Sequence, residues 1–162
     1  KYKRIRAKKI ITIHDMIHEL FPDEFLKKDN TSKLKKIAVA NADKAISTFN
    51  ALFNAKPYKT EKVQSEGVNT YFYQMGESKI ELLEATNPES PIAKFLANRK
   101  EGIHHLAFHV EDIHAEIKRL VKEGFNVLGE VKKGADNKLI CFLHPKTTNG
   151  VLVELCQEAN LE

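Results

Sequence analysis

The pattern of apolar and polar residues changes sharply near residue 34. Upstream, short amphipathic stretches over residues 14–28 are interrupted by Pro22, which predicts a basic, partly helical extension over residues 1–33. Downstream, strand-type alternation and helix-type spacing follow one another in a regular order. The pattern therefore predicts one folded domain over residues 34–158, preceded by an extension.

Within this domain, the same series of elements occurs twice. The first module, about 34–86, predicts strand, helix and three strands at residues 35–40, 43–53, 58–64, 68–75 and 79–84. The second module, about 102–158, predicts them at residues 102–110, 112–124, 126–130, 138–144 and 151–156. The segment between the modules predicts a short helix within residues 90–99. A spacing of 71 aligns Ile37 with Phe108 and Ile46 with Ile117. We therefore expect an α+β fold built from two paired βαβββ modules.

The charge of the chain is unevenly distributed. The 162 residues include 26 Lys+Arg and 22 Asp+Glu, and the first 36 residues hold 11 of the basic and 5 of the acidic ones. The basic residues are not interleaved with aromatic ones at the spacing of a nucleic-acid-binding motif, which argues against a nucleic-acid partner. We interpret the segment as a solvated extension, with an organelle-targeting remnant, a fusion joint and a partner-binding element as the alternatives.

Cysteine content and hydropathy suggest the cellular compartment. Cys141 and Cys156 are the two cysteines, too few for a disulfide framework, so a reducing compartment is expected. No apolar run approaches the roughly 20 residues of a membrane-spanning helix, so we expect no membrane partner. The sequence thus favours the cytoplasm, with a mitochondrion or another organelle as the alternative for a eukaryotic chain.

Three long motifs carry a family resemblance. The segments ESKIELLEATNPESPIAKFL, EGIHHLAFHVEDI and FLHPKTTNGVLVELCQ resemble the methylmalonyl-CoA epimerase family of the glyoxalase, or vicinal-oxygen-chelate, superfamily. The resemblance covers residues 37–158 and implies two modules that form an open curled sheet around a central cleft. It further implies a homodimeric isomerase of propionate metabolism that inverts the α-carbon of an acyl-CoA thioester through an enolate.

The resemblance also implies a divalent metal at the base of the cleft. The family holds the metal through a histidine of the first strand, a Glu or Gln of the fourth strand, the second His of an HH pair and a Glu of the last strand. Glu81, His105 and Glu154 match the last three of these positions. Carboxylate and imidazole ligands suit Co, Mn, Ni or Zn. The implied reaction is a metal-assisted 1,1-proton transfer with Glu154 as the catalytic base.

The first metal ligand of the family pattern is absent. That pattern reads His-Ile-Gly-Ile-Ala-Val, and aligning its end with Ile37–Val39 puts Leu34 on the histidine and Lys36 on the glycine. Three ligands and a water can still hold a metal, so weak binding and complete loss both stay open. If Lys36 points inward, its ammonium competes with the metal for Glu81 and Glu154, giving an inert or purely binding cleft. The alternative is that Lys36 faces solvent in a basic edge strand. The variant Leu34→His is expected to gain metal affinity.

Further residues leave the function open. Thr70 stands where some family members carry a glutamate, and a hydroxyl cannot act as a general acid–base near neutral pH; Glu66 lies nearby in an expected turn. Strand alternation predicts that His104 faces away from His105. Three hypotheses follow: a methylmalonyl-CoA epimerase, a catalytically inactive homologue that binds an acyl-CoA or other small ligand, and a glyoxalase I-type lyase.

Overall fold

The computed structural model describes residues 33–76 and 78–159. The first module comprises β1 (Lys33–Val39), α2 (Ala42–Phe53), β2 (Lys59–Val63), β3 (Val68–Met75) and β4 (Ser78–Ala85). The second comprises β5 (Gly102–His109), α4 (Ile113–Lys122), β6 (Val127–Lys133), β7 (Lys138–Leu143) and β8 (Val153–Glu158), and α3 (Pro91–Arg99) joins the two. Short 3₁₀ turns lie at Gln64–Glu66 and Pro145–Thr147. This order confirms the predicted pair of βαβββ modules. The predicted extension lies outside the described residues except for Lys33.

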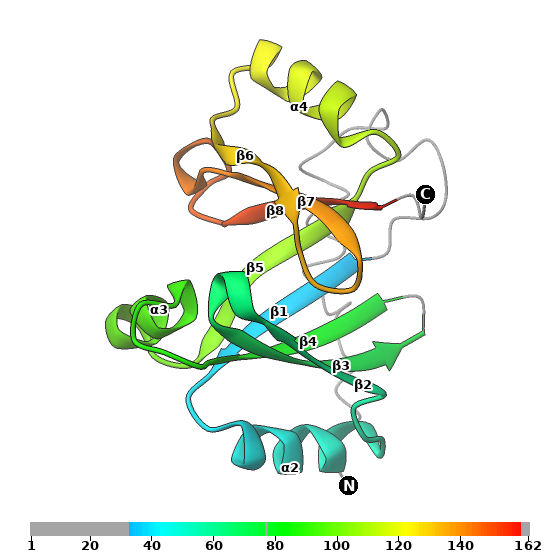
Figure 1. Ribbon diagram of the computed structural model, residues 1–162, viewed down its shortest axis with the longest axis vertical. Helices are drawn as coiled ribbons and strands as arrows, with labels where there is room; N and C mark the ends of the chain where they lie inside the picture. Colours follow the sequence, from blue (N-terminus) through cyan, green and yellow to red (C-terminus); the bar gives the residue numbers. More distant parts are fainter. Residues whose placement is uncertain (1–32, 77, 160–162) are drawn as a thin grey trace, which may run out of the picture. The chain divides into compact units, whose positions relative to one another are not determined.

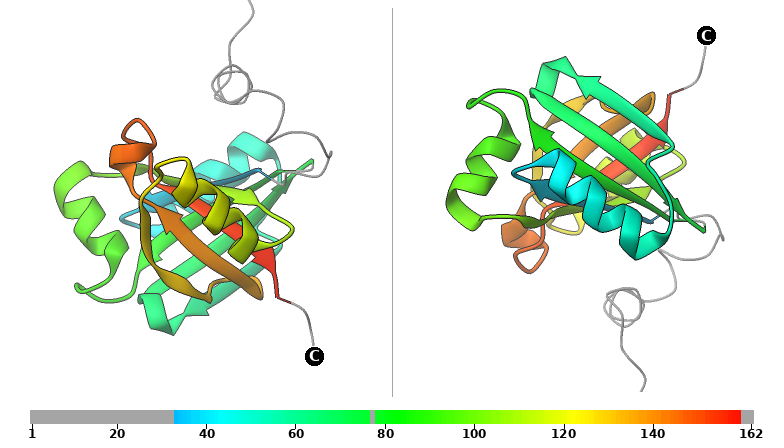
Figure 2. Two further views of the ribbon diagram at one scale, coloured as in Figure 1. Left: turned by 90° about the horizontal axis from the view of Figure 1, so that it is seen from above. Right: turned by 90° about the horizontal axis from the view of Figure 1, so that it is seen from below.

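The strands of both modules form one eight-stranded sheet in the order β2-β3-β4-β1-β5-β8-β7-β6. β1 and β5 are antiparallel neighbours at its centre, and each is parallel to the last strand of its own module, β4 or β8. The pairing in one half therefore repeats that in the other. Figure 1 shows α2 and α4 at opposite ends of the sheet, and Figure 2 shows the curled sheet from above and below. The open curled sheet that the resemblance implied is confirmed.

Both outer helices begin at side-chain caps that the sequence supplies. The carboxylate of Asp112 accepts from the backbone N–H groups of His114 and Ala115 at the start of α4. Asn41 accepts from the backbone N–H of Lys44 at the start of α2. Such caps satisfy donors that have no partner within the first turn of a helix. The repeated cap fixes the corresponding helix start in each module.

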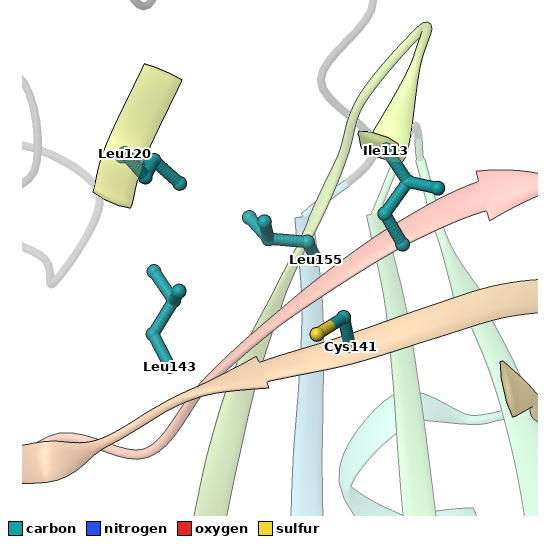
Figure 3. Close-up of a cluster of buried hydrophobic side chains, with 5 residues drawn as sticks. All are labelled: Ile113, Leu120, Cys141, Leu143 and Leu155. Carbon is teal, nitrogen blue, oxygen red and sulfur yellow. The ribbon is translucent and has the colours of Figure 1, made fainter. Parts of the chain in front are cut away.

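Alternation along the strands separates two faces of the sheet. One face packs against the helices, and Figure 3 shows its cluster beneath α4, which contains Ile113, Leu120, Cys141, Leu143 and Leu155. A corresponding cluster beneath α2 contains Val39, Tyr73 and Leu82. Residues adjacent to these in the strands point to the opposite face. Glu81 precedes Leu82 and Glu154 precedes Leu155, so packing of the helices directs both carboxylates away from the apolar clusters.

The sequence predicted that the fold lacks a disulfide framework and a membrane-spanning helix. Cys141 and Cys156 are both buried and free, which confirms that no disulfide holds this fold together. Within the described part of the chain, no helix has the length and apolar character needed to cross a membrane.

Candidate active site

A cavity of about 290 Å³ lies on the face of the sheet that carries the two carboxylates. Its apolar wall comes from both modules and α3 and consists of Val63, Val68, Leu83, Pro91, Ile92, Leu128, Ile140, Phe142 and Leu152. Of the ionisable residues that also line it, four are at most 7% exposed: Lys36, Glu81, His105 and Glu154. An apolar pocket with a few converging polar groups is the usual form of a small-ligand site.

The four ionisable residues come from four adjacent strands. Lys36 of β1 is paired in register with Glu81 of β4 on one side and with His105 of β5 on the other. Glu154 lies on β8, the next strand beyond β5. The fold thus brings together the three residues that the resemblance predicted as metal ligands, and it adds Lys36 between them.

Lys36 is the centre of the contacts in this cluster. Its Nζ donates to both oxygens of Glu154, at 3.0 and 3.1 Å, and lies 3.5 Å from Oε2 of Glu81. His105 Nε2 lies 3.0 Å from Oε2 of Glu154. Both oxygens of Glu154 are therefore engaged, whereas Oε2 of Glu81 is buried without a hydrogen-bond partner among the described residues. The two carboxylates of the site differ in their capacity to accept a further proton or ligand.

The charge state of each group follows from these contacts. Burial opposes ionisation of Glu154, but the charge of Lys36 and the hydrogen bond with His105 bring its pKa down to about 2. Burial raises the pKa of Glu81 above its usual value, against the attraction of Lys36. Burial also disfavours the ammonium of Lys36, yet Glu154 and Glu81 hold its pKa above the usual range. Near neutral pH, Lys36 and Glu154 therefore form a buried ion pair.

His104 differs from the sequence expectation. Lys36 pairs with His105 and Ile37 pairs with Ile103, so His104 is the extra residue of a β-bulge. The bulge breaks the strand alternation, and His104 lines the cavity with its Nδ1 2.7 Å from Nδ1 of His105. The prediction that His104 faces away from His105 is therefore wrong.

The two histidines and Glu154 form a hydrogen-bonded chain. Because the Glu154 carboxylate accepts from Nε2 of His105, Nδ1 of His105 is left to accept from the Nδ1–H of His104. Burial lowers the pKa of His104 to about 4 and also lowers that of His105, so both imidazoles are neutral near pH 7. This chain, together with Lys36, fixes the orientation of the Glu154 carboxylate.

These donors do not fit a divalent metal as they are arranged. The oxygens of Glu154 are bonded to an ammonium and an imidazole N–H, and Lys36 Nζ also lies 3.5 Å from Glu81. Among the described residues, no group of three or more His, Cys, Asp or Glu side chains is placed to hold a metal ion. A metal here would stand beside a cation that already neutralises its carboxylates. The inward orientation of Lys36 is one of the two alternatives that the sequence left open.

The strand register agrees with the alignment of the missing histidine. Glu81 is paired with Lys36, and Glu154 is paired with Ala107. The partners differ by 107 − 36 = 71, the spacing of the sequence repeat. Lys36 therefore corresponds to Ala107, and position 34 corresponds to His105. The chain has Leu34 where the other module has a ligand-type histidine, and Lys36 where the other module has a small residue.

Of the polar residues near the cavity, sequence reasoning singled out Thr70, which is buried in the wall, and Glu66. Glu66 bridges the two modules, because its carboxylate lies 2.6 Å from Lys132 Nζ. Asp136, in the turn between β6 and β7, accepts from Lys59 of β2 and Lys79 of β4 at 2.8 and 2.7 Å. No local pattern identifies such a bridge, because its members are 57 and 77 residues apart.

Asp136→Asn is expected to lower the free energy of unfolding by about 1 kcal/mol at pH 7. Although partial burial opposes ionisation, Lys59 and Lys79 hold the pKa of Asp136 below its ordinary 3.8. Such a carboxylate stabilises the fold above pH 3.8 and loses that contribution as the pH falls further. The difference in unfolding free energy between Asp136→Asn and the unaltered protein should therefore become smaller below about pH 4. Urea unfolding at several pH values measures this difference.

The substitution changes charge with little effect on the backbone. Asp136 has φ of 57°, a left-handed conformation that asparagine adopts readily. Glu89→Gln is the matched control, because Glu89 pairs with Lys94 on the exposed surface, where side-chain exposures are 87% and 62%. We expect no measurable effect there. Equal effects of the two substitutions would show that the bridge of Asp136 adds no stability.

A sequence comparison identifies the class of protein that this fold and site define. Residues 36–142 match the Glyoxalase/Bleomycin resistance protein/Dioxygenase superfamily, and the chain belongs to it. Among curated relatives, the chain is 39% identical over 127 residues to the mitochondrial methylmalonyl-CoA epimerase of Dictyostelium discoideum, covering 76% of each protein. It is 42% identical over 124 residues to the ethylmalonyl-CoA/methylmalonyl-CoA epimerase of Cereibacter sphaeroides, covering 75% of this chain and 92% of the relative.

Solved structures give the same result. The methylmalonyl-CoA epimerase of Mycobacterium tuberculosis superposes with a TM-score of 0.75 at 31% identity, covering 81% of this chain and 89% of the other. A methylmalonyl-CoA epimerase in complex with methylmalonyl-CoA and NH₄⁺ superposes with a TM-score of 0.75 at 30% identity, covering 83% and 99%. The family resemblance inferred from the sequence motifs is therefore confirmed.

Proposed function

We propose that this protein epimerises methylmalonyl-CoA by moving a proton on and off the α-carbon of the thioester. The observation that carries the proposal is the cluster at the cavity wall, where Glu81 and Glu154, one from each module, flank the ammonium of Lys36. The similarity to methylmalonyl-CoA epimerases, one of them solved with methylmalonyl-CoA, supports this substrate. The cavity's size of about 290 Å³ and its apolar wall suit a short acyl group.

The reaction needs two kinds of group, and the cluster contains both. An α-proton of a thioester is weakly acidic, so its removal requires stabilisation of the negative charge that develops on the thioester oxygen. It also requires a positioned base within hydrogen-bond reach. Lys36 supplies a fixed positive charge, and the buried carboxylates supply the proton acceptors. An apolar wall strengthens these electrostatic interactions because it excludes water.

Of the two carboxylates, we assign removal of the proton to Glu81. The resemblance predicted Glu154 as the base, but both of its oxygens are engaged by Lys36 and His105. Glu81 has a buried oxygen without a hydrogen-bond partner in the described residues, which is available to accept a proton. Its pKa is raised by burial, and a base of higher pKa takes up a proton more readily.

Inversion requires that a proton return to the opposite face of the enolate. Glu81 belongs to the first module, so the return step falls to the side of the second module, where Glu154 and His105 lie. Thr70, which stands where some members of the family carry a glutamate, is buried in the cavity wall. Its hydroxyl can donate a hydrogen bond to the substrate but cannot act as a general acid–base near neutral pH.

A second candidate function is binding of an acyl-CoA without chemistry. The specific observation in its favour is the ion pair between Lys36 and Glu154, which neutralises the base that the resemblance predicted. Under this alternative, the cavity takes up the acyl group while both carboxylates stay bound to the protein's own cation. The two candidates predict the same affinity for the ligand and differ in proton exchange.

Exchange of the α-proton of methylmalonyl-CoA in deuterated buffer, followed by NMR, tests the proposal. The epimerase function predicts loss of the α-proton signal far faster than in a protein-free sample. The double variant Glu81→Gln/Glu154→Gln, purified in the same way, is the control for a contaminating epimerase. Exchange at the protein-free rate, together with saturable binding of methylmalonyl-CoA by calorimetry, would contradict the epimerase function and support the binding function.

A further inference from the structure

The position of Lys36 in the site is unusual for a residue of its type. Its side chain is 9% exposed, and its ammonium lies within 3.5 Å of oxygens from both Glu81 and Glu154. A buried charge persists only when it is paired, and here one cation serves one carboxylate from each module. This is the place at which the family resemblance puts a metal.

The sequence repeat shows how this arrangement arose along β1. Relative to the second module, the chain lacks the histidine at position 34 and carries Lys36 opposite the small residue Ala107. The two differences are two residues apart on one strand. One removes a neutral metal ligand, and the other introduces a positive charge into the same cluster. Together, the two differences convert a site that binds an external metal cation into a site whose cation is a side chain of the protein.

A divalent metal and the ammonium of Lys36 compete for the same oxygens. Two hydrogen bonds from Nζ already engage both oxygens of Glu154. A metal within coordination distance of these oxygens would stand only a few ångströms from the ammonium, and like charges so close in a buried site repel strongly. The cluster can therefore accommodate either a divalent metal or the ammonium of Lys36, and in the structure Lys36 occupies this position.

We propose that the ammonium of Lys36 is the built-in cation of this site, replacing a divalent metal in stabilising the enolate oxygen of the substrate. The proposal rests on the proposed epimerase function. The α C–H bond breaks, its electron pair moves into the enolate, and the proton goes to Glu81. The enolate electron pair then forms a new C–H bond on the opposite face with a proton taken from solvent, and Glu81 returns its proton to solvent. Lys36 donates a hydrogen bond to the enolate oxygen and keeps its protons throughout. No oxidation or reduction takes place.

The first test uses the unaltered protein. We expect far less than one metal per chain by mass spectrometry after incubation with Co²⁺ and gel filtration, and an exchange rate unchanged by EDTA or Co²⁺. Stoichiometric Co²⁺ with exchange that EDTA abolishes would overturn the role of Lys36 and leave the epimerase function standing. Absence of exchange under every condition would instead overturn the epimerase function, and the metal content would still report whether Lys36 excludes a metal.

The second test converts the site back to a metal site. The double variant Leu34→His/Lys36→Ala restores the histidine of the repeat and the small residue that matches Ala107. We expect it to bind about one Co²⁺ per chain by calorimetry, as a site of two carboxylates and two histidines should. Its matched control, Leu34→His/Lys35→Ala, has the same histidine and one lysine fewer but keeps Lys36. Equal Co²⁺ affinity in the two variants would overturn the proposal.

The third test isolates the charge of Lys36 in catalysis. Lys36→Met retains the length of the side chain and removes its charge, and we expect its exchange rate to fall by roughly 100-fold or more. Circular dichroism at the assay temperature checks that the variant is folded, and Lys35→Met is the control on the neighbouring residue. Exchange by folded Lys36→Met at the rate of the unaltered protein would overturn the proposal.

Discussion

Lys36→Met is expected to lower the free energy of unfolding by about 3–5 kcal/mol at pH 7. The substitution leaves the carboxylates of Glu81 and Glu154, each 2% exposed, without their shared cation. A buried charge that has lost its partner must either stay ionised at high cost or take up a proton. Urea or thermal unfolding of the variant and the unaltered protein measures the difference.

The effect of Lys36→Met should depend on pH in a defined direction. In the unaltered protein, the pKa of Glu154 is lowered to about 2 from its ordinary 4.5. Its contribution to stability is therefore complete above pH 4.5 and is lost as the pH falls toward 2. In the variant, the carboxylates are neutralised by protons as the pH falls. The difference in unfolding free energy between the two proteins should therefore become smaller at low pH.

A matched control separates burial of charge from loss of side-chain packing. Lys35→Met makes the same chemical change at the adjacent, half-buried position of β1, and we expect it to change stability by less than about 1 kcal/mol. If Lys36→Met were as stable as Lys35→Met, the buried ion pair would not stabilise the fold.

Glu81→Gln is expected to reduce the rate of α-proton exchange by roughly 10²–10⁴-fold, the usual contribution of a general base. Its cost in stability should be smaller than that of Glu154→Gln, because it removes the 3.5 Å ion pair with Lys36 but no hydrogen bond to Oε2 among the described residues. The NMR exchange assay and urea unfolding, applied to the same preparation, measure both effects.

Glu154→Gln should lower the free energy of unfolding more than Glu81→Gln does. Its carboxylate accepts two hydrogen bonds from Lys36 and one from His105, so the substitution leaves a buried ammonium poorly neutralised. We expect a loss of about 3–5 kcal/mol in unfolding free energy. Equal stability and equal residual exchange in Glu81→Gln and Glu154→Gln would contradict the assignment of Glu81 as the proton acceptor and Glu154 as the ion-pair partner of Lys36.

Much of the site was predictable because the sequence repeats. Alternation in the segments around Glu81 and Glu154 puts each carboxylate on the face opposite a core leucine. The spacing of 71 identifies equivalent positions in the first strand and helix of the two modules, and Glu154 follows Glu81 by 73. The motif resemblance then picked out His105 among seven histidines. The histidine missing at position 34 was visible from the same spacing, and the strand register agrees with it.

Other features were not predictable from local patterns. Strand alternation failed at His104 because a β-bulge inserts that residue between two paired positions, and a single bulged residue leaves no periodic signal. The bridge from Asp136 to Lys59 and Lys79 joins one turn to two strands that are distant from it in sequence. Such ion pairs depend on how the two modules curl toward one another.

The sequence by itself determined the two βαβββ modules, the family and the identity of the clustered acidic residues, since these follow from periodicity and from long motifs. Only the tertiary structure decided the direction of Lys36. A lysine in a strand at the edge of a basic segment can face either water or the interior. The residues next to it in the sequence do not determine which way its side chain points. Pairing of β1 between β4 and β5 resolves it, because Lys36 then lies opposite Glu81 and His105 and within hydrogen-bond distance of Glu154.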